Sequence, residues 1–235
     1  MSPGSQSGGV VPGRDAGLRV TARVSLLPVD VRRLARDERA DFAAFLATLP
    51  PRQWDAPTLC AEWRVRDVVA HVVGYDELDA RGLLECVVRG RFWSSRVNAV
   101  VLERYESCSP EQLLGLLRVH LEPQGLLAAL GGRPALTEGV IHHQDVRPAL
   151  GRPRVVPPER LLVALRWALV GPDIGGLRRI RGVRVTAIDL GFSAGIGPEV
   201  RGSAEALLMS IAGRHGVAAE LSGPGRRKLA ARIGG

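Results

Sequence analysis

The sequence predicts a mainly α-helical protein, in which a helical bundle is followed by a small α+β domain. Apolar residues recur at helical spacing through the first 150 or so of its 235 residues. The proline-rich stretch GRPRVVPPER then breaks this pattern, and beyond it short alternating stretches and glycine-rich turns lie between the helices. We therefore expect a leader over residues 1–27, a bundle over 28–150 and a C-terminal domain over 151–235.

The expected leader contains MSPGSQSGGVVPGRDAGLRVTARVS and is rich in glycine, serine and proline. It lacks the apolar core of a secretion signal, so we interpret it as a flexible tail or as upstream sequence admitted by a wrong start codon. No apolar run in the chain reaches the length of a membrane span. We expect a cytoplasmic protein that does not partner a membrane.

Five helices are expected in the bundle region. The first covers 29–49 and is ended by Pro50 and Pro51. The second covers 65–85, and its apolar stripe has the spacing i, i+3, i+4, i+7 and i+8, made by Val65, Val68, Val69, Val72 and Val73. The third covers 92–105, the fourth runs from Ser109-Pro110 to about residue 130, and the fifth covers 134–150.

The C-terminal domain is expected to mix helices with short strands. Its first helix covers 159–170, GVRVTAIDL alternates like a strand, and GFSAGIGPEV is interpreted as a turn. A helix over 203–212 has Ser203 as its N-cap. GVAAEL is then expected as a short strand and PGRRKLAARI as the terminal helix.

The composition does not favour a nucleic-acid partner, although the formal charge is +8 and the pI is near 10.7. Lys228 is the single lysine among 32 basic residues, which indicates a general preference for arginine, and acidic residues lie between the arginines. Aromatic residues make up only 4%, too few for a base-stacking surface. Cys60, Cys86 and Cys108 form no CxxC pair, so we expect reduced cysteines rather than disulfides or a cysteine zinc site.

One stretch, TEGVIHHQDV, gathers residues that can bind a metal. On a helix, Glu138, His142 and Asp145 share one face, while His143 points well away from it. Glutamate and histidine one turn apart offer an oxygen and a nitrogen to zinc or a similar ion, and a further ligand must come from elsewhere. His71, on an apolar face of the second helix, is the candidate.

Two other interpretations remain open on spacing alone. A histidine on an apolar face is commonly a core residue with its hydrogen bonds satisfied. A glutamate and a histidine one turn apart also occur by chance on solvated helix faces.

Three segments resemble one known family. They are PTLCAEWRVRDVVAHVVGYD, TEGVIHHQDVRPALG and AIDLGFSAGIGPEVRGSAEALLMSIAGR. In this order they resemble the mycothiol-dependent maleylpyruvate isomerase family of actinobacteria, whose fold is a DinB-like four-helix bundle followed by a small domain. The resemblance covers about 29–233.

The resemblance implies roles for five residues. His71, Glu138 and His142 correspond to the ligands of a divalent metal, which we expect to be zinc in this chain. Asp145 corresponds to an aspartate that hydrogen-bonds a ligand or balances charge. Arg214 corresponds to the family's functional arginine, and as a catalytic residue it would hold a substrate carboxylate.

Asp145 and Arg214 each have a second interpretation that involves no functional site. The aspartate would then be a helix-end carboxylate near Arg147, and Arg214 a helix-end cation. The chain also departs from the family at Glu62, where a small residue is usual, and at Arg64, which stands where serine or threonine caps the helix. Neither departure touches an expected ligand.

The resemblance implies a metal-dependent enzyme that uses mycothiol. A thiol bound to the metal would act as a nucleophile on a small electrophilic substrate, for isomerisation or for S-transfer. The alternative is a non-catalytic metal- or partner-binding module of the same fold. The oligomeric state has no signature in the sequence.

Overall fold

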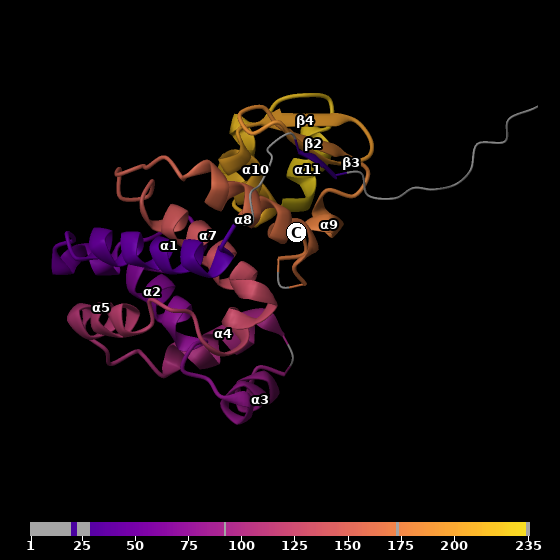
Figure 1. The fold of residues 1–235 in the computed structure, drawn as a ribbon. Helices are drawn as coiled ribbons and strands as arrows, with labels where there is room; N and C mark the ends of the chain where they lie inside the picture. The colour runs from indigo at the N-terminus through magenta and orange to yellow at the C-terminus, as the bar shows by residue number, and fades with distance from the viewer. Residues whose placement is uncertain (1–19, 23–28, 92, 173, 234–235) are drawn as a thin grey trace, which may run out of the picture.

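The structure, a computed structural model, describes residues 20–22, 29–91, 93–172 and 174–233. Figure 1 shows a helical bundle at lower left and a smaller module of sheet and helices at upper right, with α7 and α8 between them. The predicted fold class is confirmed: a mainly α protein whose bundle precedes a small α+β domain. No helix among the described residues is long and apolar enough to cross a membrane.

A four-helix bundle forms the first part of the chain. In it α1 and α2 each pack against both α5 and α7, which closes a ring around an apolar core. The helical elements before the linker are α1 (Val31–Leu46), η1 (Pro51–Asp55), α2 (Val65–Gly74), α3 (Ala80–Arg89), α4 (Ser94–Glu103), α5 (Pro110–Val119), α6 (Gly125–Ala128), η2 (Ala129–Gly132) and α7 (Arg133–Val146).

Two of the predicted helices are interrupted, and a hydrogen bond joins the two interruptions. The helix expected over 65–85 is divided into α2 and α3, and the one expected over 109–130 ends at Val119, with Pro123 in the gap. Asp76 lies in the first break and is buried. It accepts hydrogen bonds from Arg39 Nη1 on α1 at 2.5 Å and from the backbone N–H of Gln124 in the second break at 2.9 Å. The breaks therefore place a buried carboxylate between otherwise separate segments.

The C-terminal domain is built on a four-stranded sheet with the order β1-β3-β2-β4. Strand β3 is antiparallel to β2, whereas β4 is parallel to it. The elements are α8 (Pro158–Val170), α9 (Gly176–Arg179), β2 (Arg184–Ala187), β3 (Phe192–Gly195), β4 (Glu199–Gly202), α10 (Ala204–Ile211), η3 (His215–Glu220) and α11 (Arg226–Ile233). Ser203 caps α10 as predicted, its side chain accepting from the N–H of Ala206 at 3.1 Å.

Two predictions for this domain are wrong. GFSAGIGPEV contains β3 and the first half of β4, and the residues between the two strands turn. Gly197 has φ +132, and a Cβ added there would lie 2.5 Å from the carbonyl oxygen of Gly182, so glycine is required at this point of the turn. GVAAEL lies mostly in the 3-10 helix η3 rather than in a strand.

The predicted leader also needs correction. Val20–Ala22 form β1, which pairs antiparallel with β3 at the edge of the C-terminal sheet. Residues 1–19 and 23–27, the rest of the predicted leader, lie outside the described residues. The chain thus contributes a strand to the C-terminal domain before the bundle begins.

The two parts of the chain share a core. One apolar cluster lies inside the bundle and includes Phe42, Val68 and Leu117. The other joins Leu136 of α7 and Leu165 of α8 to residues of the sheet and of α10. One apolar core therefore extends across the expected boundary at residue 150. Side chains from both parts of the chain can meet at one site.

Candidate active site

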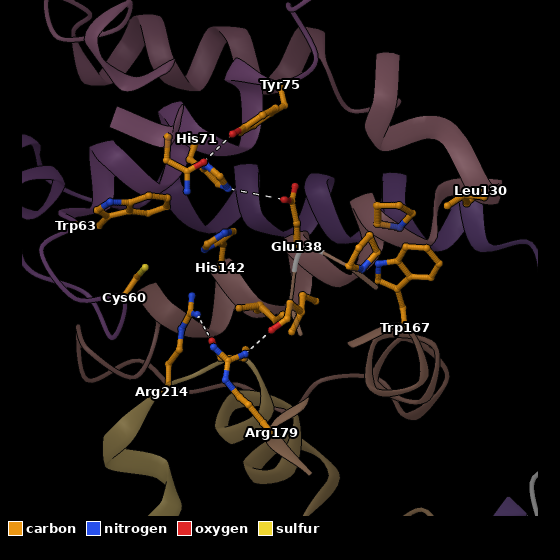
Figure 2. A pocket seen from close by; sticks show the side chains of 16 residues that line it. Cys60, Trp63, His71, Tyr75, Leu130, Glu138, His142, Trp167, Arg179 and Arg214 are labelled. Carbon is orange, nitrogen blue, oxygen red and sulfur yellow. Dashed lines mark hydrogen bonds and ion pairs between the residues drawn. The ribbon is translucent and has the colours of Figure 1, made fainter. Parts of the chain in front are cut away.

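A pocket of about 500 Å³ lies where the bundle meets the C-terminal domain. Its walls come from both parts, including His71, Glu138 and His142 of the bundle and Trp167, Arg179 and Arg214 of the C-terminal domain. Figure 2 shows His71 and Tyr75 above the pocket, and Arg179 and Arg214 reaching toward it from below. This volume suits a small-molecule ligand.

His71 is presented by α2 and is nearly buried, with 5% of its surface exposed. The valine stripe of α2 packs into the bundle core, which fixes the rotation of the helix. Asp67 helps to start α2, because its carboxylate accepts from the N–H of Arg64 at 2.9 Å where Arg64 itself offers no capping oxygen. The ring of His71 lies between aromatic neighbours, 4.7 Å from that of Trp63 and 5.2 Å from that of Tyr75.

Glu138 and His142 are presented by α7, one turn apart. The Nε2 atom of His71 lies 3.8 Å from Oε1 of Glu138. The rings of His71 and His142 are 4.9 Å apart and almost perpendicular. The structure thus brings together the three side chains expected to bind the metal.

Asp145 holds His142 and Arg214 in place. Its Oδ2 accepts from Nδ1 of His142 at 3.0 Å, and its Oδ1 accepts from Nε of Arg214 at 2.7 Å. A second bond joins Nη2 of Arg214 to Oδ2, which makes the pair bidentate. Asp145 therefore contacts Arg214 of the C-terminal domain, and Arg147 instead lies over the ring of Phe45.

The ionisation of these groups suits metal binding. Burial would raise the pKa of Glu138, but its interaction with His71 and nearby positive charges lower it, so the carboxylate is ionised. Burial lowers the pKa of His142 against the opposing effect of Asp145, which favours the neutral imidazole. Burial raises the pKa of Asp145, but hydrogen bonds from Arg214 and His142 outweigh it. Metals bind a neutral imidazole and an ionised carboxylate.

The donor chemistry fits a divalent metal. Within the described ranges, no three His, Cys, Asp or Glu side chains are grouped as closely as in a formed metal site. Nδ1 of His71 and Oε2 of Glu138 are nevertheless buried without a hydrogen-bond partner in that part of the chain. The 3.8 Å between His71 and Glu138 is close to the separation of two donors on a tetrahedral ion, about 3.4 Å for bonds of about 2.1 Å.

His143 faces the opposite side of α7, as its position in the helix predicts. Its Nδ1 lies 2.9 Å from Oε1 of Glu38, and its ring packs against Phe42 and Phe45. Glu38 also accepts from Arg154 and Arg160. This buried ionic cluster does not line the pocket.

Several pocket residues were not predicted from the sequence as site residues. Trp63 stacks over His142 with ring centroids 5.7 Å apart, and Tyr75 donates to Oδ1 of Asn98 at 2.6 Å. Trp167 and Arg179 come from the C-terminal domain. Trp63 lies within the segment that resembles the family, whereas no local spacing marks the other residues as members of the site.

Comparison with known proteins supports the same family. Residues 35–123 match the sequence profile described as the mycothiol maleylpyruvate isomerase N-terminal domain. A search of curated proteins finds no significant match. Two solved structures are similar in fold: a mycothiol-dependent maleylpyruvate isomerase, with 13% identity and a TM-score of 0.51, and a histidine-to-alanine variant of it, with 12% and 0.50. Each match covers 83% of this chain and 91% of the other chain.

These matches confirm the family resemblance that the sequence motifs indicate. The profile covers the bundle up to the segment before α6, and the structural likeness, over 83% of the chain, extends into the C-terminal domain. At this level of identity the structural likeness shows the fold.

Proposed function

We propose that this chain is a metal-dependent enzyme that uses mycothiol to isomerise, or to transfer the thiol to, a small electrophilic substrate. His71, Glu138 and His142 would hold the divalent metal, with zinc the best match to two imidazoles and a carboxylate. The observation that supports the proposal most is that buried atoms of His71 and Glu138 have no hydrogen-bond partner at the wall of a pocket large enough for a ligand. Three protein ligands would leave coordination positions open, as in catalytic sites.

The chain's own residues prepare this site. Asp145 accepts from Nδ1 of His142, which fixes the tautomer that leaves Nε2 free to bind. Arg214 in turn holds the Asp145 carboxylate and keeps it ionised. Trp63 packs against both histidines and excludes water from their faces. Burial raises the pKa of Cys60 to about 11, so this pocket thiol stays protonated and does not compete as a nucleophile.

The bound metal would supply Lewis acidity, which deprotonates a coordinated thiol at neutral pH. A thiol activated in this way would serve as a nucleophile toward an electrophilic double bond. Isomerisation would return the thiol unconsumed. Transfer would leave the sulfur on one carbon of the former double bond and a proton on the other, and would consume one thiol per turnover.

The test replaces the native metal with cobalt and adds mycothiol. A thiolate bound to cobalt gives a charge-transfer band in the near ultraviolet, so we expect that band in the wild type. His71→Ala, which removes a ligand, should lose both cobalt and band, and His143→Ala should keep both because it lies on the other face of α7. If cobalt-loaded wild type shows no band with mycothiol, thiol activation at a metal is wrong. A non-catalytic binding module would then be the better proposal.

A second measurement separates the two reactions. Thiol and electrophile are followed together during turnover by metal-loaded protein. Unchanged thiol with changing substrate indicates isomerisation, and equal loss of both indicates transfer. Turnover that is the same without thiol would contradict the proposal.

A further inference from the structure

Arg214 is the arginine expected to hold a substrate carboxylate, yet in the structure its charge is already balanced. Nε and Nη2 donate to the two oxygens of Asp145, and Nη1 donates to the carbonyl oxygen of Ala212 at 2.7 Å. Only 14% of the Arg214 side chain is exposed, and Asp145 is fully buried. A substrate carboxylate at Arg214 would therefore compete with a buried bidentate ion pair, whose disruption is costly.

Arg179 is a second arginine on the same pocket wall, and it has no carboxylate partner among the described residues. Its Nη1 donates to the carbonyl oxygens of Ile174 and Ile211, which are neutral acceptors. The groups that affect its pKa are all unfavourable to its charge: burial first, then Arg178 and Arg214. Arg179 thus places a positive charge at the pocket without a matching negative charge.

The surroundings of Arg179 leave its guanidinium open. Gly213 has φ +93, and a Cβ added there would lie 3.2 Å from Nη2 of Arg179, so the glycine leaves room beside that nitrogen. Nε1 of Trp167, on another wall of the pocket, is buried and has no hydrogen-bond partner within the described ranges. Among the described residues, the pocket therefore offers a cation without a carboxylate partner and a neutral N–H without an acceptor.

We propose that Arg179 binds a carboxylate of the small electrophilic substrate, an inference that rests on the proposed function. A single planar guanidinium suits a carboxylate, which it can meet with two parallel hydrogen bonds. Nε1 of Trp167 would donate to a further oxygen of the same ligand. Arg214 would act by positioning Asp145 and, through it, His142.

Arg178 provides a matched control. It is the residue before Arg179 on α9 and carries the same charge, but it is exposed. Both residues line an outer hollow with Arg181 and Arg232, and of these four only Arg179 also lines the pocket. Replacing Arg178 removes an equal charge from nearly the same place. Exposed charges are screened by solvent, so this change should have a small effect on a ligand in the pocket.

The experiment measures binding of succinate, an unreactive dicarboxylate, and of succinamide, its neutral counterpart, by calorimetry. Metal-loaded and metal-free protein are both used. We expect wild type to prefer succinate, and Arg179→Gln to weaken succinate binding about 10- to 100-fold, as loss of a charged hydrogen bond does. Arg178→Gln should stay within about threefold of wild type. Arg179→Lys, which keeps the charge but not the planar fork, should fall between them.

Three outcomes would overturn the inference: a wild type that does not prefer succinate, a folded Arg179→Gln protein that binds it normally, or a loss confined to Arg214→Gln. Because Arg179 also bonds two carbonyls, melting temperatures accompany each titration. If Arg179→Gln does not fold, the comparison of Arg179→Lys with Arg178→Gln decides, and equal affinities would refute the proposal. Arg179-dependent succinate binding by a protein that takes up no metal would refute the proposed function alone.

Discussion

The two neighbouring histidines of α7 face opposite sides of the helix and lie in two different polar regions. A comparison of these regions separates residues that stabilise the fold from residues that line the pocket. His142 faces the pocket beside Glu138 and His71, where buried atoms lack partners. His143 faces a buried ionic cluster in which both oxygens of Glu38 accept hydrogen bonds, from His143, Arg154 and Arg160. We name the first region the pocket face and the second the Glu38 cluster.

The contrast shows what each region does. The Glu38 cluster joins α1, α7, the linker and α8, and its carboxylate is neutralised by its partners within the protein. Nε2 of His143 and Nε of Arg160 have no partner there, but no carboxylate oxygen is left over. On the pocket face a carboxylate oxygen of Glu138 has none. A buried carboxylate oxygen without a partner at the pocket wall is the feature that supports the proposed cation there.

The largest expected effect is on metal content. If the proposed site holds a metal, His142→Ala should reduce it from about one per chain to almost none, because the change removes one of the three proposed ligands. His143→Ala should keep the metal, because Nδ1 of His143 bonds Glu38 instead. Elemental analysis of the two purified variants measures the difference. Equal loss in both would mean that the two faces are not functionally distinct.

The next effect is on stability, and here a change in the Glu38 cluster should matter more than a change on the pocket face. Glu38→Gln should lower the free energy of unfolding by about 3–5 kcal/mol, because it leaves the largely buried Arg154 without a carboxylate partner and leaves Arg160 with Asp41 alone. Glu138→Gln in metal-free protein should cost less than about 1 kcal/mol, since no arginine depends on it. Urea denaturation after treatment with a chelator compares them. A larger loss for Glu138→Gln would contradict the division.

Acid should weaken the Glu38 cluster in two stages. Burial lowers the pKa of His143 from 6.5 to about 4, and the partners of Glu38 outweigh burial to lower its pKa to about 2. Between pH 6.5 and 4 the unfolded chain takes up a proton at residue 143 that the folded chain does not, so stability falls as pH falls. The slope from one group is at most about 1.4 kcal/mol per pH unit. Glu38 adds a similar loss below pH 4.5.

Melting curves of metal-free wild type and His143→Gln between pH 7 and 5 test the first stage. The variant should lose less stability over this range, because the residue that titrates is gone. Metal-free protein is used so that protonation of the pocket histidines does not contribute through loss of metal. Parallel curves would assign the acid sensitivity to other groups.

The smallest expected effect concerns β1, which is remote from both faces. A chain that begins at Leu26 lacks β1, and one that begins at Leu18 keeps it. Loss of its pairing with β3 should cost about 1–2 kcal/mol. For a protein of this size that corresponds to a fall of roughly 2–8 °C in melting temperature. Metal content should be equal in both chains, and a difference would connect β1 to the pocket.

The sequence predicts which side chains of α7 share the pocket-facing side better than it predicts their partners. Helical spacing places Glu138, His142 and Asp145 on one face whatever surrounds the helix. The contact between Asp145 and Arg214 joins residues 69 positions apart and depends on how the C-terminal domain packs against the bundle. Nothing local in the sequence specifies such a contact, and the same holds for Arg179.

The errors in the fold have similar causes. The break after α2 is stabilised by Asp76, whose partners Arg39 and Gln124 come from distant segments, so a continuous apolar stripe was misleading. The alternation in GVAAEL is too short to distinguish a strand from a turn of 3-10 helix. The glycines around β3 belong to a tight connection between strands. Because glycine is typical of turns, the whole segment is interpreted from its sequence as a turn, although β3 and the start of β4 lie within it.

The pairing of β1 with β3 has a consequence for the order of events during synthesis. Val20 pairs with Ala194, so β1 must wait until most of the protein has left the ribosome. The helices of the bundle make contacts over shorter distances along the chain and can form earlier. While it waits, β1 has an unpaired edge of the kind that promotes aggregation. A nascent chain stalled after α7 is therefore expected to hold a formed bundle with its first strand still free.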